Sequence, residues 1–190
     1  MNKIKTGAFI PFPIAPIALV GTNIKNEPNY ATIGFTNGVN SNPAIVYISI
    51  NRNHYTSEGI LENKTFSINF PSAEYVVETD FCGLESGRKT SKSKMFTSFY
   101  GMLGTAPMIQ EFPITCECRF IDKVVEFAMD RVYFGEVVQV YINEEYVSDD
   151  KRIDSRKMNP MCFLGLENRY CEVGKEIGQG WSSGKEYRVK

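Results

Sequence analysis

The chain has almost no net charge and very little histidine. Its 190 residues carry 21 basic and 22 acidic side chains, and His54 is the only histidine. Because nucleic-acid-binding domains usually show a basic excess, the charge balance argues against a nucleic-acid partner. One imidazole cannot build a histidine-based metal site, and no G-x-S-x-G sequence accompanies it to indicate a serine hydrolase.

Leucine is also scarce, and β-branched and aromatic residues take its place. Ile and Val together number 31 against 6 Leu, with 13 Phe and 10 Tyr beside them. Such residues suit a pleated, half-buried surface, so an all-helical bundle is strongly disfavoured and a mainly β protein is expected. The length suits one domain and no repeat or low-complexity linker divides it, so we expect a single domain over residues 1–190.

Hydrophobic segments long enough to cross a membrane are missing as well. Residues 8–20 are apolar and follow two lysines, as in a secretory leader, but three prolines would break a helical hydrophobic region there. Five cysteines, an odd number at irregular spacings, do not indicate a disulfide framework. We therefore expect a protein of the reducing cytoplasm with no membrane partner.

Cys116 and Cys118 form the one close cysteine pair of the sequence. On a strand they would share a face with Phe120, while Glu117 would point to the opposite face. Small apolar side chains in the core are the favoured interpretation. A metal or redox pair is the alternative, but it would call for C-x-x-C or a second cluster, and the sequence contains neither. We expect no metal site.

Strand candidates outnumber helix candidates. Runs rich in β-branched and aromatic residues cover residues 14–22, 31–36, 44–51, 65–70, 114–125 and 133–142. Two short helices are expected, one over residues 56–63 with Thr56 or Ser57 as its N-cap, and one over residues 72–80 opened by Ser72. Between residues 83 and 113 the periodicity is lost, as in a functional loop or a partly ordered excursion. Several strands with short connections favour a barrel or a sandwich.

A tract of 24 residues, from Pro28 to Asn51, contains no ionisable side chain apart from tyrosine. Its polar groups are the amides and hydroxyls of Asn29, Thr32, Thr36, Asn37, Asn40, Ser41, Asn42, Ser49 and Asn51. Uncharged donors and acceptors among apolar surface suit a planar heteroaromatic ligand with carbonyl and ring-nitrogen groups. The alternative, which composition alone favours, is a buried antiparallel sheet with polar turns, because Asn37-Gly38 is a hairpin signal.

Arg52, His54 and Thr56 follow this tract at alternating positions and lead into the first expected helix. A guanidinium beside the exposed amides of a helix N-terminus favours a phosphate, and a threonine hydroxyl adds a hydrogen bond. An ordinary N-cap with a solvated arginine is the alternative interpretation.

Five segments occur in order along the chain: PIAPIALVGT, NYATIGFTNGVNSNPAIVYISI, HYTSEGILENKTFSINFP, DFCGLESGRKTSK and ENRYCEVGKEIG. Together they resemble the flavin reductase-like family with the FMN-binding split-barrel fold, especially its flavoredoxin-like branch. The resemblance covers nearly the whole chain. It implies a mainly β fold, a closed six-stranded antiparallel split β-barrel with a few flanking helices. It also implies an FMN cofactor and a homodimer that binds the flavin near its interface.

The resemblance further implies the cofactor-binding residues. The stretch along the isoalloxazine is matched by Phe35, Thr36, Asn37 and Asn40, and the stretch along the ribityl chain and phosphate by Ser49, Ile50, Asn51, Arg52, His54 and Thr56. Ser86 and Gly87 match a serine-glycine pair beside the flavin, and Lys92 matches the family's lysine. A lysine or oriented N–H groups would stabilise the negative charge of reduced flavin, and the phosphate needs cationic or helix N-terminal partners. The resemblance supplies no catalytic acid or base.

One position departs from the family pattern. Many of its flavin reductases carry an Asp-His pair before a late strand, with the histidine near the nicotinamide of NAD(P)H, but this sequence has Asp130-Arg131. The change favours an FMN-dependent oxidoreductase or electron carrier that holds its flavin and exchanges electrons with a redox partner protein. An NAD(P)H:flavin oxidoreductase that releases reduced flavin is the first alternative. A non-catalytic split-barrel module that binds another planar ligand, such as haem, is the second.

Overall fold

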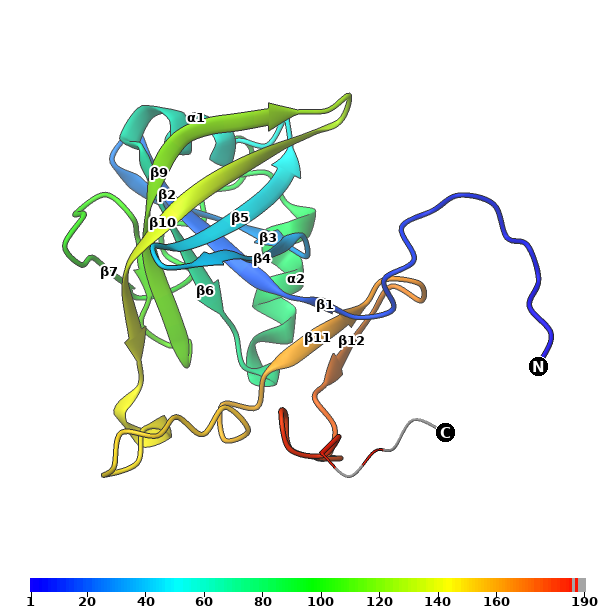
Figure 1. Cartoon of the computed structure of the whole chain (residues 1–190). Helices are drawn as coiled ribbons and strands as arrows, with labels where there is room; N and C mark the ends of the chain where they lie inside the picture. The colour runs from blue at the N-terminus through cyan, green and yellow to red at the C-terminus, as the bar shows by residue number, and fades with distance from the viewer. Residues whose placement is uncertain (186, 188–190) are drawn as a thin grey trace.

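In the part of the chain that the structure describes, residues 1–185 and 187, a curved sheet with two short α-helices dominates (Figure 1). The structure is a computed structural model. Its elements are β1 (Ala15–Pro16), β2 (Ala18–Ile24), β3 (Glu27–Ile33), β4 (Thr36–Ser41), β5 (Ala44–Asn51), α1 (Thr56–Asn63), β6 (Thr65–Phe70), η1 (Ala73–Tyr75), α2 (Val76–Leu84), β7 (Ser98–Phe99), β8 (Met108–Ile109), β9 (Ile114–Glu126), β10 (Asp130–Ile142), η2 (Glu144–Tyr146), β11 (Met161–Leu164) and β12 (Arg169–Glu172). The predicted mainly β fold with a few helices is confirmed.

Seven strands among the described residues form one antiparallel sheet, in the order β3-β2-β6-β9-β10-β5-β4. Its two end strands, β3 and β4, are consecutive in the sequence and are separated by Gly34 and Phe35 alone. This short link brings the ends of the sheet together, and the Ser49 N–H donates to the Phe35 carbonyl at 2.8 Å. The ladder of the described strands does not join β3 to β4, so the predicted closed six-stranded barrel is not confirmed.

The inner face of the curl holds the main core. Alternate residues of the central strands point into it, among them Val20, Ile68, Cys118 and Tyr133, all fully or almost fully buried. Cys116 packs in the same cluster, with its Sγ 3.9 Å from that of Cys118. The prediction that this cysteine pair belongs to the core is confirmed.

A second apolar cluster lies outside the curl, under α2 and the segment that carries β7 and β8. It contains Leu19, Tyr30, Cys82, Phe96, Ile109 and Phe112. The rings of Tyr30 and Phe96 meet edge to face with centroids 5.6 Å apart. Through Phe96, Ile109 and Phe112, this cluster anchors the segment between residues 83 and 113, where the sequence shows no periodicity.

Glu117 is fully buried, although strand alternation alone would place it on an ordinary polar face. Its carboxylate accepts hydrogen bonds from the backbone N–H groups of Met102 and Leu103, both at 2.8 Å, and from the Tyr141 hydroxyl at 3.0 Å. The loop before β8 folds over this carboxylate. Charge-assisted hydrogen bonds offset the free-energy cost of burying it.

A smaller sheet, in the order β1-β11-β12, extends from the main body near α2 (Figure 1). The Tyr170 hydroxyl of β12 donates to the Asp80 carboxylate of α2 at 2.8 Å and ties this hairpin to the helix. The chain before β1 runs away from the sheet as an extended arm that exposes Phe9, Phe12 and Ile14. No helix in the described residues is both long and apolar enough to cross a membrane.

Several local predictions need correction. The Asn37-Gly38 pair lies within β4, beside a register shift, and the turn between β4 and β5 is formed by Asn42-Pro43 instead. Tyr55, rather than Thr56 or Ser57, occupies the N-cap position of α1, and no side chain caps it. Ser72 precedes the short turn η1, while α2 itself begins at Val76.

Candidate functional site

A small polar cavity of about 200 Å³ lies where β3, the start of α1 and the segment after α2 meet. Five of the predicted site residues line it together: His54, Thr56, Ser86, Gly87 and Lys92. They come from two segments about thirty residues apart in the sequence, which the contact of α1 and α2 with β3 brings together. The structure thus groups the residues predicted for the phosphate with those predicted beside the flavin.

Lys92 is the most unusual group in this cavity, because only 3% of the residue is exposed. Its ammonium donates to the backbone carbonyls of Tyr30 at 2.9 Å and Cys82 at 2.8 Å. An ammonium has three N–H donors, so one remains after these two bonds. No described carboxylate forms an ion pair with it, and burial lowers the pKa of Lys92 from its ordinary value. A buried cation without a counter-ion favours an anionic ligand at this point.

Thr56 and Gly87 meet across the cavity through Asn29 of β3. The Asn29 side-chain amide donates to the Thr56 hydroxyl oxygen at 3.2 Å, and both residues are buried. A Cβ added at Gly87 would lie 2.0 Å from the Asn29 Oδ1, so only glycine allows the backbone to approach this closely. The segment 86–87 therefore forms a wall of the cavity that presents backbone rather than a side chain.

His54 borders the same cavity and keeps an exposed face. Partial burial of its ring, followed by the positive charge of Lys92, lowers the pKa of His54 from the ordinary value of 6.5, and Asp130 acts weakly in the opposite direction. The imidazole is consequently neutral at pH 7, with one nitrogen that donates and one that accepts.

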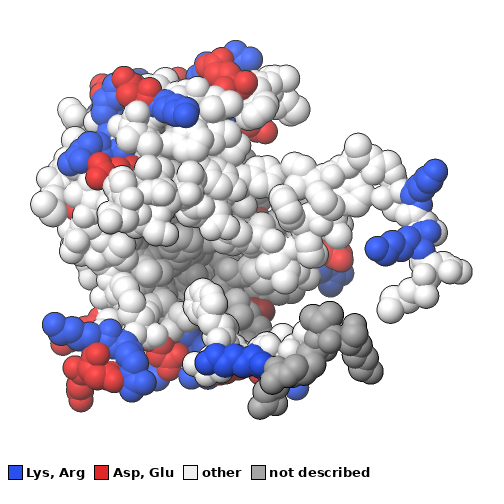
Figure 2. All heavy atoms as spheres, in the orientation of Figure 1, with Lys and Arg blue, Asp and Glu red and all other residues white. Residues whose placement is uncertain are grey.

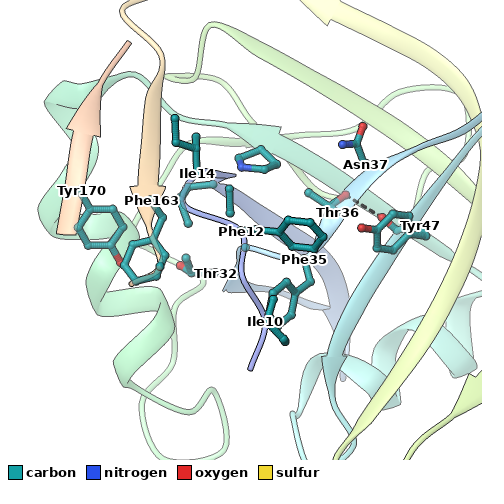
Figure 3. Close-up of a pocket in the computed structure, with 15 residues that line it drawn as sticks. Ile10, Phe12, Ile14, Thr32, Phe35, Thr36, Asn37, Tyr47, Phe163 and Tyr170 are labelled. Carbon is teal, nitrogen blue, oxygen red and sulfur yellow. Dashed lines mark hydrogen bonds between the residues drawn. The ribbon is translucent and has the colours of Figure 1, made fainter. Parts of the chain in front are cut away.

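A larger cavity of about 580 Å³ is lined by the β3–β4 link, Gly34 and Phe35, and its neighbours (Figure 3). Phe35, Thr36 and Asn37, all predicted site residues, line it together with Thr32 and Tyr47. The Thr36 hydroxyl donates to the Tyr47 carbonyl at 2.7 Å, so the donor of this buried side chain is satisfied. The aromatic rings of Phe35 and Tyr47 take no part in this bond. The volume is in the range of sites for cofactor-sized ligands, and the lining is mostly apolar.

The remaining walls of this large cavity come from both ends of the chain. Ile10, Phe12 and Ile14 of the N-terminal arm lie on one side of it, and Phe163 and Tyr170 of the β11–β12 hairpin on another (Figure 3). Strand β3 contributes to both cavities, through Asn29 and Ala31 to the small one and through Thr32 to the large one.

The other predicted site residues line neither cavity. The Asn40 amide donates to the Pro43 carbonyl at 2.7 Å in the β4–β5 turn, and Ile50 packs in the main core. The Asn51 side-chain oxygen accepts a hydrogen bond from the backbone N–H of Asn53 at 3.0 Å. The backbone N–H of Ser49 donates to the Phe35 carbonyl, and that of Arg52 donates to the Met129 carbonyl. The assignment of all thirteen predicted residues to a cofactor stays a prediction, and these five lie outside the two cavities.

Arg131, where the family's histidine was expected, lies on β10 opposite Ile50 of β5. Its Nε is 2.9 Å from the Glu126 carboxylate of β9. Arg131 lines neither cavity among the described residues, and its charge is matched within the sheet.

Sequence reasoning left several lining residues outside the candidate site. Asn29 and Thr32 were visible in the uncharged tract as potential hydrogen-bond groups, but nothing in the pattern ranked them above the others. Tyr170 and Phe163 lie in or beside the last of the five quoted segments. No sequence pattern indicated that Ile10 and Phe12 line a cavity, because apolar residues among prolines have no periodicity.

The distribution of charged residues on the surface is consistent with a binding site for an uncharged ring. Figure 2 shows a face of the molecule whose middle is uncharged and hollowed, while Lys, Arg, Asp and Glu gather toward two opposite ends. An uncharged, hollowed face suits a neutral ring better than a charged macromolecule.

A comparison with known protein families matches residues 14–165 to the flavin reductase-like domain. The chain belongs to the flavin reductase-like family. Both cavities fall mainly within the matched residues, and members of this family are flavin-dependent oxidoreductases.

Within the flavin reductase-like family, the chain is similar to two flavoredoxins of known structure. That of Methanosarcina acetivorans is 38% identical, with a TM-score of 0.93 over 97% of this chain and 98% of the other. That of Desulfovibrio vulgaris (Miyazaki F) is 29% identical, with a TM-score of 0.88 over 97% of this chain and all of the other. An uncharacterized protein of Aquifex aeolicus is 25% identical and covers 87% of this chain and 86% of its own. The protein is thus flavoredoxin-like, with a split-barrel fold.

Proposed function

We propose that this protein binds FMN tightly and works as a flavoredoxin-like electron-transfer protein. The observation that carries the proposal is the buried ammonium of Lys92, which lines a polar cavity, forms no ion pair with a described carboxylate and keeps one N–H beyond its two bonds to carbonyls. A flavin nucleotide is a neutral ring joined to an anionic phosphate, and the two cavities beside β3 differ in the same way. The similarity to two flavoredoxins supports the proposal.

The small polar cavity suits the phosphate. At about 200 Å³ it is small for a tricyclic ring, and it lies at the start of α1, where the positive end of the helix dipole favours an anion. Lys92 would supply the positive charge, and the Thr56 hydroxyl, which accepts from Asn29, keeps its hydrogen free to donate. Ser86 and the backbone at Gly87 would add further donors.

The large cavity suits the isoalloxazine. Phe35, Tyr47 and Phe12 offer aromatic surface, the Asn37 amide offers N–H donors to ring carbonyls, and the Thr36 hydroxyl oxygen can only accept, because its hydrogen is used by the Tyr47 carbonyl. When bound, FMN would supply the redox chemistry by accepting and releasing electrons. The protein's part would be to hold the ring, restrict access of water and oxygen, and set the potential through the surrounding groups.

Electron exchange with a partner protein is proposed in preference to direct oxidation of NAD(P)H. Arg131 replaces the expected histidine, and its guanidinium is engaged with Glu126 rather than directed to either cavity. An NAD(P)H:flavin oxidoreductase remains the competing assignment and a haem-binding module the second, and the experiment below separates them.

We also propose that the protein is a homodimer. The N-terminal arm exposes Phe9, Phe12 and Ile14 while bordering the large cavity, and exposed apolar side chains at a ligand site favour coverage by another chain. A second copy would enclose the ring. Light scattering should give twice the protomer mass; a protomer mass in the presence of FMN would contradict this part of the proposal.

The absorbance spectrum of the purified protein is the decisive test. We expect flavin bands, or their appearance at about one FMN per protomer after FMN is added to the apoprotein. A colourless protein that ignores FMN would contradict the proposal, and a haem spectrum would support the binding module. Anaerobic addition of NADH or NADPH should leave the bound flavin oxidised, whereas reduced ferredoxin-type or other protein donors should bleach it. Rapid bleaching by micromolar NADH would establish the reductase instead.

A further inference from the structure

Two cysteines that the proposed flavin site does not use face each other across the β11–β12 hairpin. Cys162 of β11 is the register partner of Cys171 of β12. Both are free and half-buried, whereas Cys82, Cys116 and Cys118 are buried. The hairpin therefore carries the two accessible thiols of the chain, at directly opposed positions.

Directly opposed residues of an antiparallel pair have the Cα spacing that a disulfide bond requires. Their Cα atoms lie about 4.5 Å or about 5.5 Å apart, depending on the class of pair, and their side chains point to the same face. Disulfides form at Cα separations of about 4.4–6.8 Å. Both classes fall within this range, so Cys162 and Cys171 can be joined without a change of strand register.

We propose that Cys162 and Cys171 form a reversible dithiol–disulfide site, which low-molecular-weight disulfides oxidise by thiol–disulfide exchange. The site is distinct from the flavin cavities and does not depend on FMN. Both cysteines are partly accessible to solvent, which favours a labile bond, and a structural crosslink is not needed because the hairpin is already held by its own ladder and by the Tyr170–Asp80 hydrogen bond.

The exchange proceeds in two balanced steps. One cysteine loses its proton to solvent, and its thiolate attacks the external disulfide, forming a mixed disulfide and releasing one external thiolate. The second cysteine then loses its proton and attacks the protein sulfur of that mixed disulfide. The Cys162–Cys171 bond forms, and the second external thiolate leaves. The protein has lost two electrons and two protons, and the external disulfide has been reduced to two thiols.

The environment of Cys162 predicts how this reaction depends on pH. Burial, followed by the nearby Cys171, raises the pKa of Cys162 above its ordinary value. The thiolate is the attacking species, so a raised pKa makes the reaction slow at neutral pH and faster as pH rises.

The crosslink would lie one residue away from the large cavity. Phe163 and Tyr170 are the neighbouring register pair, their rings are 5.3 Å apart, and both line that cavity. Successive residues of a strand point to opposite faces, so the cysteines lie on the reverse face of the hairpin. A bond between them would fix the spacing of the two strands that carry these aromatic rings.

Tryptic peptide mapping tests the proposal directly, because Arg169 is a cleavage site between the two cysteines. The purified full chain is incubated with glutathione disulfide at pH 8, free thiols are alkylated, and the digest is analysed without reduction. We expect peptide 158–169 joined to peptide 170–175, a fall from five free thiols to three, and full recovery with dithiothreitol.

Variants make the assignment specific. Cys162→Ser and Cys171→Ser should each abolish the crosslink and retain glutathione as a stable mixed disulfide on the remaining cysteine. Cys116→Ala, a matched change at a buried cysteine, should keep the crosslink. Five free thiols after oxidation, a bond within peptide 95–119, a persistent mixed disulfide in the unaltered chain, or a bond between two chains would each overturn the proposal.

Discussion

The side-chain amide of Asn29 donates a hydrogen bond to the Thr56 hydroxyl at 3.2 Å and so joins β3 to the first residue of α1. The same side chain touches the backbone at Gly87, where a Cβ would be 2.0 Å from its Oδ1. One amide thus fixes the relative positions of three segments that line the small polar cavity. Its shape depends on a residue that the family resemblance did not assign to the cofactor.

Lys92→Met should weaken FMN binding much more than riboflavin binding. Methionine keeps most of the buried apolar stem but removes the charge, and a charge-assisted hydrogen bond contributes about 1.5–3 kcal/mol, roughly a 10- to 150-fold change in Kd. Fluorescence titration of the apoprotein with both flavins measures the difference.

Lys94→Met, in the same loop but exposed, is the control and should leave both affinities within about twofold. Equal losses for FMN and riboflavin in Lys92→Met would mean that Lys92 does not face the phosphate.

His54 should titrate below pH 6.5 in the apoprotein, because partial burial and the charge of Lys92 disfavour its protonated form. Between the folded and unfolded pKa values the unfolded chain binds more protons, so acidification through this window lowers the free energy of unfolding. As the only histidine, it gives an unambiguous NMR signal. Lys92→Met should move its midpoint upward, and FMN should do the same. A midpoint unchanged by both would separate His54 from this cavity.

Glu117→Gln should destabilise the protein by about 1–3 kcal/mol, because a neutral amide replaces a buried carboxylate that accepts three hydrogen bonds. Urea unfolding of the apoprotein measures the change. Glu136→Gln on β10, whose ion pair with Arg119 is exposed, should cost less than about 1 kcal/mol. Similar losses in the two variants would show that the loop at Met102 and Leu103 contributes little to stability.

Phe35→Ala should reduce FMN affinity about 3- to 10-fold, which corresponds to an aromatic contact of about 0.5–1.5 kcal/mol. Riboflavin should lose the same factor, because the ring is common to both. Val39→Ala, also exposed and on the same strand as Thr36, is the control and should bind normally. Normal affinity in Phe35→Ala would exclude this residue from the ring site.

Much of the fold could be predicted from local pattern. The bounds of β5 and β6 agree with the expected residues 44–51 and 65–70, because both strands are continuous β-branched or aromatic runs between clear breakers. The Asn37-Gly38 signal failed because pairing with β5 extends β4 past it, and Asn42-Pro43 makes the turn instead. Tertiary pairing overrode a local turn preference.

The site could be predicted only in part. Lys92 came from the family resemblance, since a lysine in an aperiodic segment is ordinarily solvated. Its ammonium is held by a carbonyl of β3, which is distant in the sequence, and by one of α2, and neither contact is visible in the local pattern. Glu117 follows strand alternation, but the loop that covers its face is a non-local contact that no periodicity reveals. The contact of the N-terminal arm with the large cavity is also non-local, so the sequence did not predict its residues as part of the site.

The contact between Gly87 and Asn29 has a consequence for recognising this cavity elsewhere. A side chain at position 87 would displace the amide that holds Thr56, so the two positions constrain each other although 57 residues separate them in the chain. A flavoredoxin-like sequence with a bulky residue at the first position must repack the second. Asparagine and glycine at these two distant positions therefore indicate the small polar cavity more specifically than a lysine alone does.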